Sequence, residues 1–313
     1  MIADEILPPG FRPRPLGIHA LVGGAVVVRP GQTLDGATIV IRDGFIAAVG
    51  KDLSPPADAR IWDVKGLTIY AGFIEPYLTV GSTNAAISTS DSEPGKTDAF
   101  TAGGAGFFRA AGQRTDAGHR GPGYPIAKIT PEFRAVRAYS PDKKTIAPLR
   151  ELGFTTAVIA PTRGIVRGTS ALVALAEADP NELVLKPDVF QHIAFETHES
   201  DEVAYPGSVM GAIAAVRQSF FDADWQLKLT DRRRPEYNPS LDALAPAVEG
   251  KMRVLFEPGS ALMVDRAARV ARELKLDFAI VSCGQEWRRP ELAKETGATF
   301  IVPLNFPTLP KLP

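Results

Sequence analysis

The sequence has a single cysteine, Cys283, so no internal disulfide can form and redox chemistry is not indicated. Stability must come from a hydrophobic core, which 313 residues with 45% hydrophobic content can build. No apolar run reaches the roughly 18 residues of a membrane span, and the proline-rich start lacks the apolar centre of an export signal. We therefore expect a soluble protein, either cytoplasmic or exported with its signal missing, and the compartment stays open.

An excess of charge of either sign is also missing. The 35 Lys and Arg residues and 36 Asp and Glu residues give a net charge of -1. Nucleic acids and anionic membranes favour proteins with concentrated positive charge. The one basic run, Arg232 to Arg234, precedes Pro235 and Pro239 and has no aromatic stacking series beside it, which is typical of a solvated loop. We expect neither nucleic acid nor membrane as a partner.

After an extended segment, 1–17, the pattern over residues 18–67 is one of short β-branched runs separated by turn signals. The pair Asp43-Gly44 stands between two such runs and predicts a hairpin, because glycine adopts positive φ at little cost. This part predicts a small antiparallel sheet, the N-terminal part of a β-sandwich subdomain.

Residues 81–142 are rich in Gly, Ser, Thr and Pro and show little periodicity. An irregular excursion of this length within a compact domain either covers a site or is partly disordered. Four aromatic residues within it suggest that it is pinned to the rest of the fold: Phe107, Phe108, Tyr124 and Phe133.

Beyond Thr145 helical segments alternate with nearly continuous apolar strands, which predicts βα units and a parallel sheet. Six strands are expected: LTIYAGFIE, TTAVIAP, VFQHIAFET, MRVLFEPG, DFAIVSCG and TFIVPLN. A complete (β/α) barrel has about eight. The segment RGIVRGTSALVAL lacks the Gly-Lys-Ser/Thr of a phosphate loop and is interpreted as a turn and a strand. The predicted fold class is α/β, with a partial TIM-type barrel at 68–313 that stops early.

The segment VKGLTIYAGFIEPYLTVG resembles the junction between sandwich and barrel in the amidohydrolase superfamily, including its imidazolonepropionase-like and dihydroorotase-like members. Upstream, GATIVIRDGFIAAVG is similar to the family's sandwich hairpin, and downstream LRELGFTTAVIAP is similar to its second βα unit. The resemblance extends over about residues 21 to 306. It implies a metal-dependent hydrolase fold.

The resemblance also implies an acidic residue and a His-x-His pair after Gly-Phe-Ile, but the chain has Glu75, Tyr77 and Thr79 there. Neither neutral side chain matches imidazole as a zinc ligand near neutral pH. Glu257, and Cys283 or Ser282, replace the histidines of later strands, and the family's aspartate general base falls beyond residue 306. The four histidines lie elsewhere: His19, His119, His192 and His198.

Several side chains fall at or after strand ends, the face where barrel active sites form. The candidate pocket comprises Glu75, Tyr77, Thr79, Glu196, His198, Glu257, Cys283 and Glu286. Glu257 precedes Pro258-Gly259 and is expected to accept backbone N–H groups of the next helix. The other strand-end carboxylates are expected to cap helices or to pair with arginine, or alternatively to hold a metal.

Three residues have competing interpretations. Cys283 is interpreted as a small core residue rather than a nucleophile, because no histidine or cation stands near it in sequence. His192 is interpreted as a satisfied core histidine. Tyr77 with Trp287 either lines a ligand pocket or packs under a loop.

The leading hypothesis is an amidohydrolase-like domain, related to hydrolases of non-peptide C–N bonds, that is non-catalytic and needs no cofactor. One alternative is a divergent enzyme whose Glu75, Glu196, His198 and Glu257 hold Zn²⁺, Mn²⁺ or Mg²⁺. Another is a ligand-binding or scaffold module that holds a small molecule. Open strand edges predict a homo-oligomer or association with a downstream amidohydrolase domain.

Overall fold

The computed structural model describes residues 17–79, 122–140, 143–197, 205–229 and 236–303. The chain divides into two compact units, 1–72 and 73–313. The predicted strand LTIYAGFIE is interrupted at this division. Its first part is strand β5 (Thr68–Ile69) of unit 1, and its second part begins strand β6 (Phe73–Leu78) of unit 2.

Unit 1 contains one five-stranded sheet in the described residues. Strands β1 (Ile18–Arg29), β2 (Gln32–Arg42), β3 (Phe45–Gly50) and β4 (Arg60–Asp63) lie in the order β3-β2-β1-β4, and β5 pairs with β1. The prediction of an antiparallel sheet is confirmed for β1, β2 and β3 but is wrong for β4 and β5, which run parallel to β1. The sandwich remains a prediction, because the described part of this unit has no second sheet.

The predicted hairpin is confirmed between β2 and β3. Arg42 pairs with Phe45, and the two turn residues, Asp43 and Gly44, have φ values of 51° and 82°. This left-handed conformation costs glycine little, which explains why the turn forms at this dipeptide. The turn sets the register of β2 and β3, in which Ile39 pairs with Val49, and Ile39 also packs with Val26 of β1 in the core of unit 1.

The described part of unit 2 contains two sheets. The first has the order β10-β9-β7-β6, where β6 and β7 (Phe154–Ile159) are parallel while β9 (Ala171–Ala174) and β10 (Val184–Lys186) are antiparallel to their neighbours.

The second sheet has the order β14-β13-β12-β11-β8. Strands β11 (Phe190–Ala194), β12 (Arg253–Glu257), β13 (Phe278–Val281) and β14 (Thr299–Ile301) are parallel, and β8 (Val166–Thr169) is antiparallel to β11. The described residues form no closed barrel.

The interpretation of RGIVRGTSALVAL as a turn and one strand is wrong, because the segment forms two strands, β8 and β9, which lie in different sheets and pair antiparallel with their neighbours. Between β7 and β11 the described helix is α3 (Pro180–Leu183), a single turn, so no long helical crossover returns the chain for parallel pairing. Gly168 of β8 has a φ of 100°, and a Cβ there would lie 2.1 Å from the Phe133 carbonyl oxygen. Only glycine permits this close approach of the segment 122–140.

The helices follow the predicted segments. They are α2 (Lys143–Glu151), α4 (Val209–Leu227), α5 (Pro239–Val248), α6 (Ala261–Glu273) and α7 (Pro290–Thr296), with short helices η1 (Ala135–Ala138) and η2 (Glu286–Arg288). Ser208 caps α4 by accepting a hydrogen bond from the Gly211 N–H at 3.2 Å. None of the helices in the described ranges is long and apolar enough to cross a membrane.

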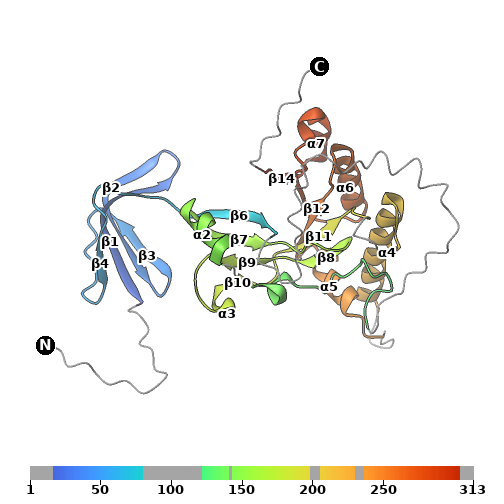
Figure 1. The fold of residues 1–313 in the computed structure, drawn as a ribbon, viewed down its shortest axis with the longest axis horizontal. Coiled ribbons are helices and arrows are strands. Elements are labelled where there is room, and N and C mark those ends of the chain that lie inside the picture. Colours follow the sequence, from blue (N-terminus) through green and yellow to red (C-terminus); the bar gives the residue numbers. More distant parts are fainter. Residues whose placement is uncertain (1–16, 80–121, 141–142, 198–204, 230–235, 304–313) are drawn as a thin grey trace. The chain divides into compact units, whose positions relative to one another are not determined.

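The main core lies between helices α4, α5 and α6 and the sheet that contains β11 and β12 (Figure 1). Phe220 of α4, Leu244 of α5 and Val264 of α6 pack with Ile193 and Phe256 from the strands. Apolar burial of this kind contributes about 25 cal/mol for each Å² removed from water. Because successive side chains of a strand point to opposite faces, the residues that alternate with Ile193 and Phe256 are directed away from the helices.

The irregular excursion is described at 122–140, whereas Phe107, Phe108 and His119 lie outside the described residues, as does the basic run 232–234. Tyr124 is 4% exposed, and its hydroxyl donates to Asp222 at 2.8 Å. Arg134 forms an ion pair with Asp188 at 2.5 Å. The expectation that aromatic side chains pin this segment is confirmed for Tyr124.

We expect unit 1 to promote self-association, because Phe45 and Ile46 of the edge strand β3 are 78% and 66% exposed. Sedimentation velocity should show concentration-dependent oligomers that the double change Phe45→Lys and Ile46→Lys reduces. Leu152→Lys, at a residue 68% exposed in unit 2, serves as the control. A monodisperse monomer at all concentrations would contradict this expectation.

Candidate functional site

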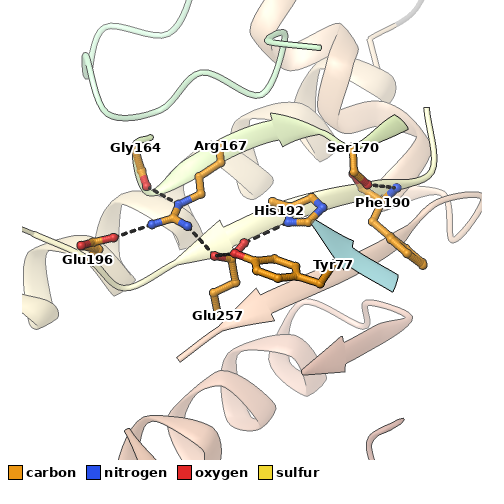
Figure 2. A network of polar contacts seen from close by, with 8 residues as sticks. All are labelled: Tyr77, Gly164, Arg167, Ser170, Phe190, His192, Glu196 and Glu257. Carbon is orange, nitrogen blue, oxygen red and sulfur yellow. Dashed lines mark hydrogen bonds and ion pairs between the residues drawn. The ribbon is translucent and has the colours of Figure 1, made fainter. Parts of the chain in front are cut away.

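A few polar side chains of unit 2 lie around Glu257, at the end of β12. Tyr77 comes from β6, Arg167 from β8, and His192 from β11, and Glu196 follows β11 (Figure 2). We call these five residues the Glu257 network. Because β11 and β12 are parallel with Ala194 opposite Glu257, the alternation of side chains places all the network residues from these two strands on the face away from the helices.

Both oxygens of the Glu257 carboxylate accept hydrogen bonds. Oε2 accepts from the Tyr77 hydroxyl at 2.7 Å and also from Nη1 of Arg167, and Oε1 accepts from Nδ1 of His192 at 2.9 Å. The Glu257 side chain is 11% exposed. A carboxylate removed from water in this way requires such partners, because an unpaired buried charge is strongly unfavourable.

Arg167 joins two carboxylates. Its side chain is 6% exposed, Nη1 donates to Glu257, and Nη2 donates to Glu196 at 2.5 Å. Its Nε donates to the carbonyl of Gly164 at 3.1 Å, so all three nitrogens of the guanidinium have partners. The Glu196 side chain is 53% exposed and therefore remains partly hydrated.

The network also fixes protonation states. Burial raises the pKa of the Glu257 carboxyl, but the His192 hydrogen bond and the Arg167 charge outweigh burial, so the pKa lies below its usual value. Burial, with the nearby Glu257 charge, raises the pKa of the Tyr77 hydroxyl above its usual value. At neutral pH Glu257 is therefore an anion and Tyr77 a neutral hydrogen-bond donor.

His192 is completely buried, as predicted for a core residue, but it is not fully satisfied. Its Nδ1 donates to Glu257, whereas its Nε2 has no hydrogen-bond partner within the described part of the chain. The prediction of a fully satisfied core histidine is wrong at this atom.

The structure corrects the expected role of Glu257. It was predicted to accept backbone N–H groups at the start of the next helix, but its oxygens accept from side chains of three other strands. Helix α6 begins at Ala261, four residues further on. The general expectation that strand-end carboxylates pair with arginine is confirmed for Glu257 and Glu196.

Two of the candidate pocket residues near Tyr77 lie outside the network. The Glu75 carboxylate accepts the backbone N–H of Tyr77 at 3.0 Å, which is a local turn contact. Thr79 is partly buried and takes no part in the network. His198 lies outside the described residues, and His19 belongs to unit 1, where it accepts a hydrogen bond from Trp62 at 3.3 Å.

Cys283 and Glu286 form a separate turn after β13. Glu286 accepts from the Ser282 hydroxyl at 2.7 Å and from the Cys283 backbone N–H at 2.8 Å. Burial raises the pKa of the Cys283 thiol to about 11, which leaves little thiolate at neutral pH and disfavours a nucleophilic role. Trp287 is 59% exposed and is absent from the network that contains Tyr77.

Sequence reasoning missed two buried cations, Arg167 and Lys128. Arg167 stands in the mostly apolar run GIVRGTSALVAL, and a lone arginine in a buried strand indicates a paired charge. Lys128 is 7% exposed, and its Nζ donates to the carbonyl of Thr197 at 2.7 Å. No comparable signal marks Lys128, because the irregular segment around it has no periodicity.

No protein-family model matches the chain, and no curated protein sequence matches it significantly. Among solved structures it is similar to an amidohydrolase from Thermotoga maritima MSB8, with a TM-score of 0.68 and 17% identity over 91% of this chain and 70% of that one. A second amidohydrolase has a TM-score of 0.42 and 17% identity, over 92% of this chain and 66% of that one. A prolidase in complex with N-methylphosphonate-L-proline has a TM-score of 0.40 and 15% identity, over 90% and 65%.

The chain has an amidohydrolase-type fold. Of these three similarities, that to the Thermotoga protein has a TM-score above 0.5, and at 17% identity it establishes a shared fold and not a shared activity. The chain spans just under two thirds of the length of the second amidohydrolase. The resemblance deduced from the sequence motifs is therefore confirmed at the level of the fold.

The residues of the network do not fit the metal ion that this fold implies. No group of three His, Cys, Asp or Glu side chains in the described ranges is placed to hold a metal. Glu196 and Glu257 are bridged by the guanidinium of Arg167, which donates to each of them from a different nitrogen. Tyr77 donates a hydrogen bond to Glu257 and so does not offer a phenolate ligand.

The pH dependence of stability should report the ionised state of Glu257. Because its pKa in the folded state lies below the unfolded value of about 4.3, its stabilising contribution is present above that pH and is lost as the pH falls through the folded-state pKa. Urea unfolding of the wild type and of Glu257→Gln should therefore differ most near neutral pH and converge in acid. A difference that is independent of pH would contradict the assignment.

We expect Tyr77→Phe to lower the free energy of unfolding by about 1.5 to 3 kcal/mol, because a hydrogen bond to a buried carboxylate is lost. Urea denaturation measures this change. Tyr70→Phe, at a residue 67% exposed in unit 1, is the control and should have almost no effect. Equal effects of the two changes would argue against the contact.

Proposed function

We propose that this chain is a non-catalytic amidohydrolase-like domain, related to hydrolases that act on non-peptide C–N bonds. The observation that supports this most directly is the state of Glu257. Its carboxylate, at a strand end where the fold would place a metal ligand, accepts hydrogen bonds from Tyr77, Arg167 and His192. The function of this network is then to join strands β6, β8, β11 and β12 rather than to activate water.

The residues at the positions of the absent His-x-His pair support the same proposal. The raised pKa of Tyr77 keeps its hydroxyl protonated and directed at Glu257, and Thr79 is neutral. A metal-bound water needs a site rich in imidazole, thiolate or free carboxylate ligands. The network instead contains a permanent cation, Arg167, which would repel a second one.

The alternative of a divergent enzyme places a metal among Glu75, Glu196, His198 and Glu257. In the described residues the Glu75 carboxylate accepts the backbone N–H of Tyr77, and Glu196 and Glu257 share the guanidinium of Arg167. A metal at this position would have to displace an arginine that is 6% exposed. The contacts therefore favour the non-catalytic function.

A second candidate function, a ligand-binding module, is favoured by Lys128. Lys128 is 7% exposed, and a backbone carbonyl is the one hydrogen-bond partner of its ammonium group among the described residues. Buried charges are usually neutralised by a group of opposite charge. A small anionic molecule would supply that charge, and native mass spectrometry of the purified chain would detect it.

Elemental analysis tests the proposed function. The purified chain, before and after dialysis with Zn²⁺, Mn²⁺ and Mg²⁺, should hold less than about a tenth of an equivalent of metal, because its carboxylates are already paired. Glu257→Ala serves as the control for metal bound elsewhere. Near-stoichiometric metal in the wild type that Glu257→Ala abolishes would overturn the proposal and direct the search to amide substrates.

A further inference from the structure

Arg167 occupies an unusual position for a structural arginine. Its guanidinium binds carboxylates from two different parts of the chain, Glu196 after β11 and Glu257 at the end of β12, and it is held in place by the Gly164 carbonyl. The planar fork of a guanidinium can bind two carboxylates at once, whereas a lysine ammonium acts as a single point of charge. Arg167 therefore bridges the two carboxylates, as Figure 2 shows.

The carboxylates of Glu196 and Glu257 need a positive charge between them. Without Arg167, the carboxylate of Glu257 would remain buried, with the hydroxyl of Tyr77 and the imidazole of His192 as its hydrogen-bond donors. Glu196 would face the same space with a second negative charge. Two carboxylates that share a site without a cation repel each other, and one of them then takes up a proton or a metal ion.

We propose that Arg167 is the resident cation of the Glu257 network and that its guanidinium keeps divalent metal ions away from Glu196 and Glu257. This inference rests on the proposed non-catalytic function and names the residue responsible for it. Arginine suits the role because it stays protonated at every physiological pH. Replacement of Arg167 by an uncharged residue should leave two oxygen-donor groups that prefer a hard cation such as Mn²⁺.

The experiment compares four chains and one control variant in a titration with Mn²⁺, in which free Mn²⁺ is measured by electron paramagnetic resonance. They are the wild type, Arg167→Met, Arg167→Lys, and the double variant Arg167→Met with Glu257→Gln. Arg163→Met is the matched control, because Arg163 is an exposed arginine four residues away.

We expect Arg167→Met to bind about one equivalent of Mn²⁺, at least about tenfold more tightly than the wild type, because the competing cation is gone. Arg167→Lys should bind less than Arg167→Met, since it keeps the charge. The double variant should lose the gain, and Arg163→Met should behave as the wild type does. A folded Arg167→Met chain that binds no more Mn²⁺ than the wild type would overturn the inference.

Arg167→Met could also fail to fold, because it leaves Glu257 without its counter-charge. Refolding from urea with and without Mn²⁺ then decides the question. Recovery of folded chain that depends on Mn²⁺ and on Glu257 supports the inference, and recovery unaffected by Mn²⁺ overturns it. Stoichiometric metal in the wild type would instead reject the proposed function, so the two failures are distinguishable.

Discussion

A carboxylate that is buried at the end of a strand needs a counter-charge, and in this protein Arg167 supplies it to Glu257. The contact does more than balance charge. Together with the hydrogen bonds from Tyr77 and His192, it connects side chains from β6, β8, β11 and β12, which belong to two different sheets of unit 2. The Glu257 network therefore connects the two sheets, and each of its side chains limits the positions of the others.

The pleat of the strands separates this network from the apolar core. Ile193 and Phe256 face the helices and belong to the core, while His192 and Glu257, one residue away along each strand, face the opposite side. A shift of the register between β11 and β12 by one residue would exchange the two sets and bury the charges against the helices. The apolar core and the ionic network thus specify the same pairing.

The similarity to the Thermotoga maritima amidohydrolase at 17% identity shows that this fold is compatible with very different sequences. The fold depends on the alternation of apolar strands with helices, which many sequences satisfy. The chemistry of the strand ends depends on a few side chains, and here Tyr77 and Thr79 stand where the sequence motif implies histidines. Changes at such positions alter the site without disturbing the core on which the fold depends.

The sequence by itself determined the local elements and the missing histidines. The hairpin at Asp43-Gly44, the helices α2 and α4 to α7 and the parallel strands β11 to β14 follow from turn chemistry and hydrophobic periodicity, which act between residues close in the chain. The partner of Glu257 could not be predicted, because Arg167 lies 90 residues away and meets it through strand pairings that the local pattern does not encode. Tertiary structure alone decided that β8 and β9 enter different sheets and that a guanidinium, rather than a helix terminus, neutralises Glu257. The reason is that long-range pairing depends on the packing of the whole unit.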